Sequence, residues 1–159
     1  MSSLLWFFLG CSKGTFDVTG NPDGSAFTAV TAHWGSQFII FLDQDIACID
    51  MWWVQTFNLS GDEPPTNTDL RALQITYNND ERDIFEGPYS IGGEAPIKTE
   101  FLEISGDTFN VTKATDGLLE LSEKIDATSL TGGLNFAFSG GGTVVGTFED
   151  ISWCNNIKP

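Results

Sequence analysis

The stretch that decides the fold is residues 133–154, which read GLNFAFSGGGTVVGTFEDISWC. In its first half, Leu134, Phe136 and Phe138 alternate with small or polar residues. This period of two predicts a β-strand with one buried face. The glycine run 140–142 follows, and it supplies the positive φ values that a hairpin loop requires.

The second half of this stretch predicts the returning strand. Val144 and Phe148 share one face, whereas Ile151 and Trp153 have the opposite parity. A β-bulge near residues 149–150 would bring both pairs to the same side, because a bulge adds one residue to one strand. The stretch is therefore predicted to form a bulged β-hairpin that ends in a cysteine.

Further runs with a strand-like pattern recur along the chain. They cover residues 15–19, 26–34, 37–43, 51–59, 71–77, 98–105, 107–113 and 118–126. The last run also fits a helical spacing, but its neighbours favour a strand. Residues 78–96 contain no convincing strand and are predicted to form a long loop. About nine or ten short strands joined by hairpins predict an all-β fold, an antiparallel β-sandwich with a closed β-barrel as the alternative.

The composition fits one folded domain, which we expect to span residues 25–159. The chain has 159 residues with 13 Phe and 5 Trp, so a substantial hydrophobic core is available. Its formal net charge is -15, from 22 acidic and 7 basic residues. Such a surface repels phosphate backbones, which excludes nucleic acid as an expected partner. The acidity indicates either simple solubility or divalent-cation binding.

The first residues of the sequence have the character of an export signal. Residues 4–9 read LLWFFL, an apolar run far too short to span a bilayer. The run resembles the end of a secretory hydrophobic region, and Phe8-Leu9-Gly10-Cys11 resembles a bacterial lipobox. The resemblance implies a signal-like segment at 1–10, a lipid anchor on Cys11, and a tether with a first short strand at 11–24. In the alternative, residues 4–9 form a strand packed on the core.

Cysteine counting supports the same location. The chain has three cysteines, so lipidation of Cys11 would leave Cys48 and Cys154 as an even pair. Export would place that pair in an oxidising compartment, where a disulfide is expected. The alternative is two separate buried thiols.

A second resemblance covers the middle and the end of the chain. The segment LDQDIAC at 42–48 and the Gly146-Thr147-Phe148 strand before Cys154 look like parts of small uncharacterised bacterial surface lipoproteins. That family implies an all-β domain in the bacterial cell envelope or outside the cell. It implies no known activity and no active-site residues.

Acidic residues suggest one candidate cofactor, calcium. Asp43 and Asp45 lie close to Cys48, and Asp80 and Asp83 lie in the predicted loop 78–96. Calcium takes six to eight oxygen ligands, which carboxylates and loop carbonyls provide. No stretch fits the EF-hand loop, so such a site would be assembled across loops. The alternative is ordinary solvated loops, with no cofactor at all.

Candidate catalytic residues are few. His33 is the single histidine, and no Gly-x-Ser-x-Gly motif accompanies it, so we expect a structural histidine. A glycosidase would need two facing carboxylates, for which Glu100, Glu103, Glu120 and Glu123 are the candidates. Trp52 and Trp53 would then stack on a sugar ring, although tryptophans in alternating strands are usually core residues.

We therefore expect a non-catalytic, exported or cell-surface domain with a binding or envelope-structural role. The alternative is a carbohydrate-binding β-sandwich or a jelly-roll glycosidase. Expected partners are the membrane, through the lipid anchor only, and an unidentified protein or glycan. Exposed edge strands would also allow self-association.

Overall fold

The chain folds as an antiparallel β structure in the computed structural model, which describes residues 14–35, 38–48, 69–77, 87–93, 97–106, 108–122 and 129–154. Within these residues the secondary structure consists of ten strands joined by turns and loops. The strands are β1 (Thr15–Gly20), β2 (Phe27–Thr28), β3 (Thr31–Gly35), β4 (Phe38–Leu42), β5 (Leu70–Tyr77), β6 (Gly87–Ser90), β7 (Ile97–Ser105), β8 (Thr108–Leu121), β9 (Ser129–Phe138) and β10 (Thr143–Trp153). The all-β prediction is confirmed.

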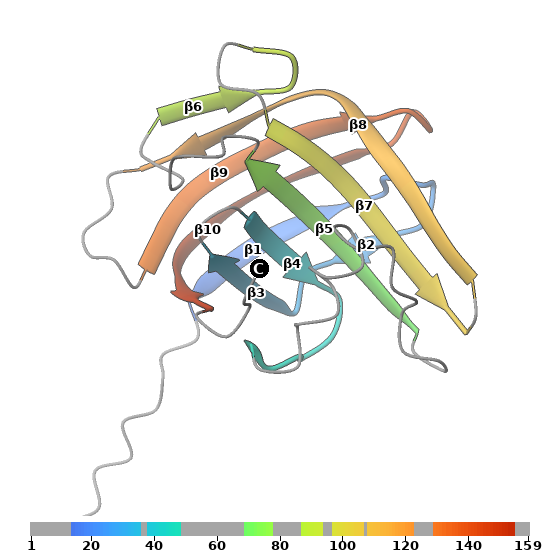
Figure 1. The fold of residues 1–159 in the computed structure, drawn as a ribbon, viewed down its shortest axis with the longest axis horizontal. Coiled ribbons are helices and arrows are strands. Elements are labelled where there is room, and N and C mark those ends of the chain that lie inside the picture. The colour runs from blue at the N-terminus through green and yellow to red at the C-terminus, as the bar shows by residue number, and fades with distance from the viewer. Residues whose placement is uncertain are drawn as a thin grey trace, which may run out of the picture.

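Seven of the described strands close into a barrel (Figure 1). Hydrogen-bonded neighbours run β10-β3-β4-β5-β7-β8-β9, and β9 pairs again with β10. Neighbours pair antiparallel except β10 and β3, which are parallel. The strands thus form one ring and not two facing sheets, so the barrel alternative is the one confirmed. Strands β1, β2 and β6 attach to this ring from outside the closed circuit.

The hairpin of β9 and β10 forms as its pattern predicts. Leu134, Phe136 and Phe138 are buried in the barrel interior, together with Val144 and Phe148 of the returning strand. Their register is antiparallel, with Phe136 opposite Val144. The interior is filled mainly by aromatic and branched side chains, so removal of their apolar surface from water is the main stabilising term of the fold.

The predicted bulge is also present. The pairing of β10 with β9 shifts register between Phe148 and Ile151, and Asp150 has a φ of 53°. The N–H of Asp150 donates to Oγ1 of Thr131 at 3.1 Å. Beyond the bulge, Ile151 is buried in the same interior cluster as Phe148, as the change of parity requires.

Strands β4, β5 and β7 are apolar on both faces. Ile39 and Phe41 point into the barrel, whereas Phe38, Ile40 and Leu42 belong to a second buried cluster on the outer face. That cluster also contains Leu70, Ala72, Leu102, Ile104 and Cys154. The seven-strand ring is therefore packed on its inside and along part of its outside.

The predicted disulfide between Cys48 and Cys154 is present. Their Cα atoms lie 5.5 Å apart, and the two residues are separated by 106 positions in the sequence. The bond joins the segment after β4 to the residue that follows β10.

Two strand predictions need correction. Gly87–Ser90 forms β6, which pairs with Leu118–Leu121 of β8, so the expected loop 78–96 contains a strand. The runs 107–113 and 118–126 were expected as two strands, but the chain continues as the single strand β8 through a register shift between Ala114 and Asp116. At this shift Gly117 has a φ of 144°, which lets one long strand pair first with β7 and then with β9.

Several predictions fall outside the described residues. They are the signal-like segment 1–10 with its alternative as a first strand, Cys11, and the run 51–59. No helix that is long and apolar enough to cross a membrane occurs in the part of the chain that the structure describes.

Candidate functional site

One edge of β10 changes its pairing strand at the bulge. Strand β9 lies on one edge of β10 throughout, from Thr143 to Ser152. The other edge pairs first with β1, up to Thr15 opposite Glu149, and then with β3, from His33 opposite Ser152. Strands β1 and β3 thus occupy successive parts of the same edge of β10. No pairing joins the two directly among the described residues.

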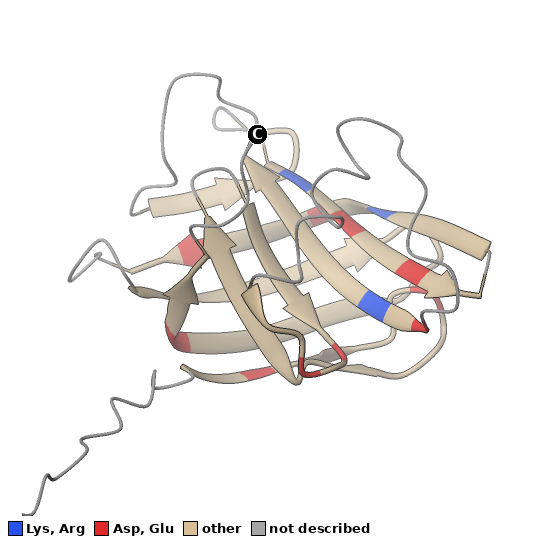
Figure 2. Cartoon of the chain, turned by 60° about the horizontal axis from the view of Figure 1, so that its bottom comes forward, with Lys and Arg blue, Asp and Glu red and all other residues tan. Residues whose placement is uncertain are grey.

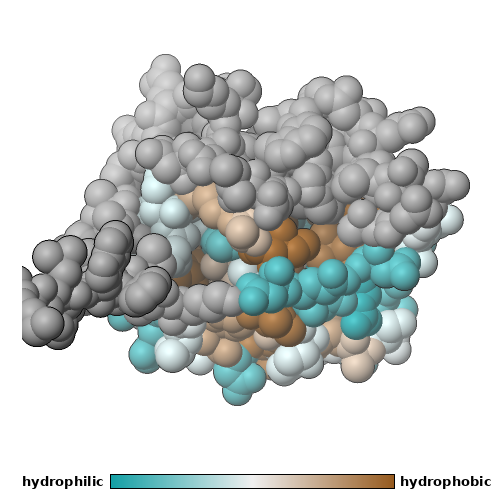
Figure 3. Space-filling view, turned by 90° about the horizontal axis from the view of Figure 1, so that it is seen from below, coloured by the Kyte–Doolittle hydropathy of each residue, from teal (hydrophilic) through white to brown (hydrophobic). Residues whose placement is uncertain are grey.

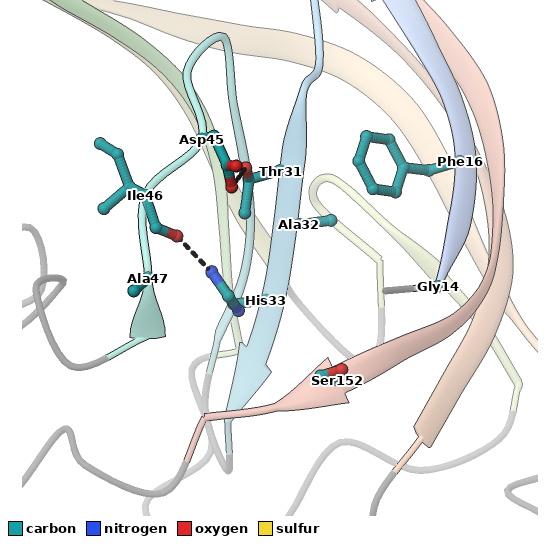
Figure 4. Close-up of a pocket in the computed structure, with 9 residues that line it drawn as sticks. All are labelled: Gly14, Phe16, Thr31, Ala32, His33, Asp45, Ile46, Ala47 and Ser152. Atoms are coloured by element: carbon teal, nitrogen blue, oxygen red, sulfur yellow. Dashed lines mark hydrogen bonds between the residues drawn. The ribbon is translucent and has the colours of Figure 1, made fainter. Parts of the chain in front are cut away.

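A cavity of about 360 Å³ lies at this junction (Figure 4). The walls that the structure describes come from four separate segments of the chain, which are Gly14 and Phe16, Thr31–His33, Asp45–Ala47, and Ser152. In Figure 4 the ring of Phe16 projects from β1 toward the β3 strand that carries Ala32. The volume falls within the range of about 300–1,000 Å³ that small-molecule sites occupy.

The apolar part of the cavity comes from both sides of the junction. Phe16 packs against the barrel core, and Ala32 is buried at 7% exposure. Ile46 packs against the outer cluster, and Ala47 is exposed beside it. Carbon surface therefore lines the cavity on both sides of β3 in Figure 4, at Phe16 on one side and at Ile46 on the other, which suits a ligand with an apolar body.

The polar part of the cavity has a defined hydrogen-bond pattern. Nε2 of His33 lies 2.8 Å from the carbonyl oxygen of Ile46. A carbonyl oxygen only accepts, so Nε2 carries the hydrogen, and Nδ1 of the neutral ring is the acceptor. Nδ1 is buried and has no hydrogen-bond partner among the described residues. The hydroxyl of Thr31 donates to Oδ1 of Asp45 at 3.3 Å.

Three interactions attach the segment Asp45–Ala47 and the following Cys48 to the barrel. Thr31 binds Asp45, His33 binds the backbone of Ile46, and the disulfide at Cys48 anchors the next residue to Cys154. The polypeptide itself connects it to β4. Because these attachments are spread over the whole segment, this wall of the cavity is fixed before a ligand arrives.

His33 has the structural role that its solitary occurrence predicts, and it also lines the cavity. Its hydrogen bond ties the segment after β4 to β3. Sequence reasoning placed no ligand site around it, because Phe16, Thr31, Ala32, Ile46, Ala47 and Ser152 carry no motif. The nearest signal was the position of Asp45 between His33 and Cys48.

The aspartates proposed for calcium are not gathered into one site by the described structure. Nε of Arg71 pairs with Oδ2 of Asp43 at 3.0 Å, and the backbone N–H of Arg71 donates to Oδ1 at 2.9 Å. Asp45 faces the cavity instead, and Asp80 and Asp83 lie outside the described residues. Within the described ranges, no three His, Cys, Asp or Glu side chains are placed to hold a metal ion. Acidic residues are scattered over several strands and loops in Figure 2.

The glutamates proposed for glycoside hydrolysis do not line the cavity. Glu100 is 4% exposed and pairs with Nζ of Lys98 at 2.8 Å. Glu103 lies three residues further along β7, so its side chain leaves the opposite face of the strand. Glu120 is exposed on β8, and Glu123 lies outside the described residues.

The tryptophans proposed for sugar stacking, Trp52 and Trp53, also lie outside the described residues. Among the described tryptophans, Trp34 is fully buried and meets Trp153 edge to face, with 4.3 Å between ring centroids. Hydrophobic residues reach the described surface between hydrophilic ones on the face seen in Figure 3. Comparison with protein-family models, with curated proteins and with solved structures found no match to this chain.

Proposed function

We propose that this chain is a non-catalytic binding domain that works outside the reducing cytosol, with the cavity between β1 and β3 as its ligand site. The observation that carries the proposal is the cavity itself, which has two apolar walls, a polar rim and a covalently anchored side. A site whose walls are held in place loses little conformational entropy when a ligand binds.

The chemistry of the rim favours binding over catalysis. A histidine acts as a general base toward a hydroxyl or water within hydrogen-bond reach of its free nitrogen. In this protein Nε2 of His33 is engaged by a backbone carbonyl. No serine or threonine hydroxyl hydrogen-bonds to Nδ1 among the described residues. Asp45 is the one carboxylate among the described residues of the cavity wall, and these include no second carboxylate to act with it.

The disulfide supports an extracytoplasmic location. Disulfides persist in secreted and envelope proteins and are rare in reducing compartments. We infer that the domain belongs to the bacterial cell envelope or the extracellular space, attached to the membrane through a lipid on Cys11. Intact mass of the protein isolated from a bacterial membrane fraction tests this. A diacylglyceryl mass on a chain that starts at Cys11 is the expected result, and an unmodified thiol there would contradict it.

The binding role can be tested with the single histidine as the reporter. Because the chain contains one His, its ring Cε1–H signal in a carbon–proton NMR spectrum belongs to His33 without further assignment. We expect some members of a small-fragment library to shift this signal in a saturable way. No saturable shift from any fragment at millimolar concentration would reject the cavity as the ligand site.

A blocking variant makes the assay specific. Ala47→Trp places a large side chain at the exposed rim and leaves the buried core unchanged, so the His33 shifts should disappear. Ala26→Trp is the matched control, because Ala26 is exposed and lies outside the cavity wall. Equal fragment binding by both variants would place the ligand elsewhere.

A further inference from the structure

The polar atoms of the cavity are hydrogen-bond acceptors in the main. The Asp45 carboxylate only accepts. The Thr31 hydroxyl gives its hydrogen to Asp45, which leaves its oxygen lone pairs as acceptors. His33 gives the one N–H of its neutral ring to Ile46. Of the described side chains in the wall, only the hydroxyl of Ser152 keeps a donor that these contacts do not use.

The charge of the cavity points the same way. Among the described residues, its lining contains one carboxylate and no lysine or arginine. The chain as a whole carries a formal charge of -15, which raises the local concentration of cations and lowers that of anions at an acidic rim. From the lining residues that the structure describes, an anionic ligand would meet no positive charge, and the Ser152 hydroxyl would be the side-chain donor open to it.

An edge of β3 lies open beside this rim. Thr31 and Ala32 pair with Leu42 and Phe41 of β4 on one edge of the strand. Strand β10 reaches the other edge only at His33 and Trp34. The edge at Thr31 and Ala32 that faces β1 therefore has no strand partner among the described residues. An open strand edge presents N–H and C=O groups alike, so the preference for one charge comes from the side chains. An ammonium group has three donors, and Asp45 and Thr31 offer it acceptor oxygens.

We propose, on the basis of the binding role argued above, that the ligand is a primary amine carried on a compact apolar body. The ammonium group lies at Asp45 and Thr31, and the apolar body lies along the open edge of β3, against the carbon surface of Ile46 and Phe16. The Phe16 ring faces the cavity, so its face or edge is available to the carbon skeleton of the ligand. Asp45 sets the preference for a cation, and the carbon walls provide most of the affinity.

Three probes with the same ring and different head groups test this preference. They are 2-phenylethylamine, 2-phenylethanol and phenylacetate, titrated against the His33 ring signal at low salt. We expect the amine to bind more tightly than the alcohol, and the carboxylate to bind most weakly. The side chain of Nα-acetyl-lysine N-methylamide carries the same ammonium on a flexible stem of four methylene groups with no ring. If 2-phenylethylamine binds more tightly than this lysine derivative, the ligand is a small molecule. If the lysine derivative binds more tightly, the ligand is a lysine of a partner protein.

Asp45→Asn is the decisive variant. Asparagine keeps an oxygen for the Thr31 hydroxyl and removes the charge. Asp45 is exposed, so we expect the amine to bind roughly two- to fivefold more weakly, in line with the ~0.2–1 kcal/mol of a solvated ion pair, and the alcohol to bind unchanged. Asp17→Asn is the control, because Asp17 is exposed on β1 and outside the cavity wall, and it should leave both affinities nearly unchanged.

The outcomes separate this inference from the binding role itself. If the alcohol binds as well as the amine, or Asp45→Asn has no more effect than Asp17→Asn, the ammonium preference is wrong while the cavity remains a binding site. If none of the probes and no fragment shifts the His33 signal, the binding role fails as well. Salt screens exposed ion pairs. We therefore also expect that 0.5 M salt lowers the ratio of amine affinity to alcohol affinity by about as much as Asp45→Asn does.

Discussion

Cys48 and Cys154 bring the segment after β4 against the end of β10, with their Cα atoms 5.5 Å apart across 106 positions of sequence. The same two segments contribute Asp45–Ala47 and Ser152 to the cavity. The disulfide is therefore both a constraint on the unfolded chain and part of the frame of the candidate site.

Removing this disulfide should cost much of the stability of the fold. A bond that closes a loop of this length contributes about 4–5 kcal/mol in the chain-entropy model. We expect the double variant Cys48→Ala/Cys154→Ala to unfold at clearly lower urea concentration than the oxidised protein. Reductant should shift the parent protein in the same direction and leave the double variant unaffected. Equal midpoints for oxidised and reduced parent protein would argue against the bond.

Arg71 fastens three segments at one end of the barrel. It pairs with Asp43, which directly follows β4, and its Nη1 donates to the carbonyl oxygen of Ala26 at 2.6 Å. The pair is partly shielded, with side-chain exposures of 29% and 16%. We expect Arg71→Ala to lower the free energy of unfolding by about 1–3 kcal/mol, because charge-assisted bonds are lost and Asp43 keeps no cation.

A double-mutant cycle isolates the ion pair. The coupling between Arg71→Ala and Asp43→Asn, measured by urea unfolding, should be roughly 0.5–1 kcal/mol. Lys113→Ala removes an exposed cation from β8 and should change stability by less than about 0.5 kcal/mol. If Arg71→Ala lowered the free energy of unfolding as little as Lys113→Ala, the contacts of Arg71 with Asp43 and Ala26 would not be stabilising.

Gly132 is required by close approach of its neighbours. A Cβ on this residue would overlap the carbonyl oxygen of Glu120 and lie 2.8 Å from Cζ of Phe148, which is itself buried. We therefore expect Gly132→Ala to destabilise by about 2 kcal/mol or more in thermal or urea unfolding. The adjacent Gly133→Ala is the matched control, because its Cβ would have 3.6 Å to the nearest atom. Similar losses for the two variants would contradict this explanation.

Asp150 holds the bulge in a left-handed backbone conformation, with φ at 53°. Glycine adopts this region without steric cost, whereas β-branched residues do not. Asp150→Gly should be neutral or stabilising by up to about 1 kcal/mol, and Asp150→Val should destabilise by about 1–2 kcal/mol. Glu149→Val changes the neighbouring exposed carboxylate in the same way and should have a smaller effect. If Glu149→Val destabilised the protein more than Asp150→Val, backbone strain at Asp150 would be ruled out.

The tautomer of His33 follows from one hydrogen bond. Because Nε2 donates to the carbonyl of Ile46, the neutral ring should carry its proton on Nε2 and none on Nδ1. Long-range proton–nitrogen correlation spectra of the protein with a neutral His33 ring distinguish the two tautomers directly. A proton found on Nδ1 would break the link between β3 and Ile46, and with it the acceptor character proposed for the rim.

Local patterns were sufficient to predict the strands whose side chains alternate. The period of residues 134–138 predicted a buried face, and the change of parity after Phe148 predicted the bulge, because in each case the signal is contained within one strand. Strand β6 was missed because it begins Gly87-Pro88, a turn signal, and only Tyr89 of its residues is buried. A strand held in place by its neighbour carries little pattern of its own.

The closed ring and the cavity could not be derived in the same way. Closure depends on the parallel contact of His33 and Trp34 with Ser152 and Trp153, which joins strands far apart in the sequence. The cavity wall contains one candidate from the sequence, Asp45, and that residue was expected to serve calcium. Its remaining walls come from ordinary strand residues that are brought together only by the change of partner at the bulge.

The short parallel contact between β3 and β10 has a consequence for how the protein matures. One part of the ring is completed by two residue pairs, and these involve the last described strand of the chain. During synthesis, β10 must be present before the barrel can close and before Cys48 and Cys154 can form their disulfide. The candidate site is consequently assembled at the final stage, so occupancy by a ligand would report a molecule that has finished folding and oxidation.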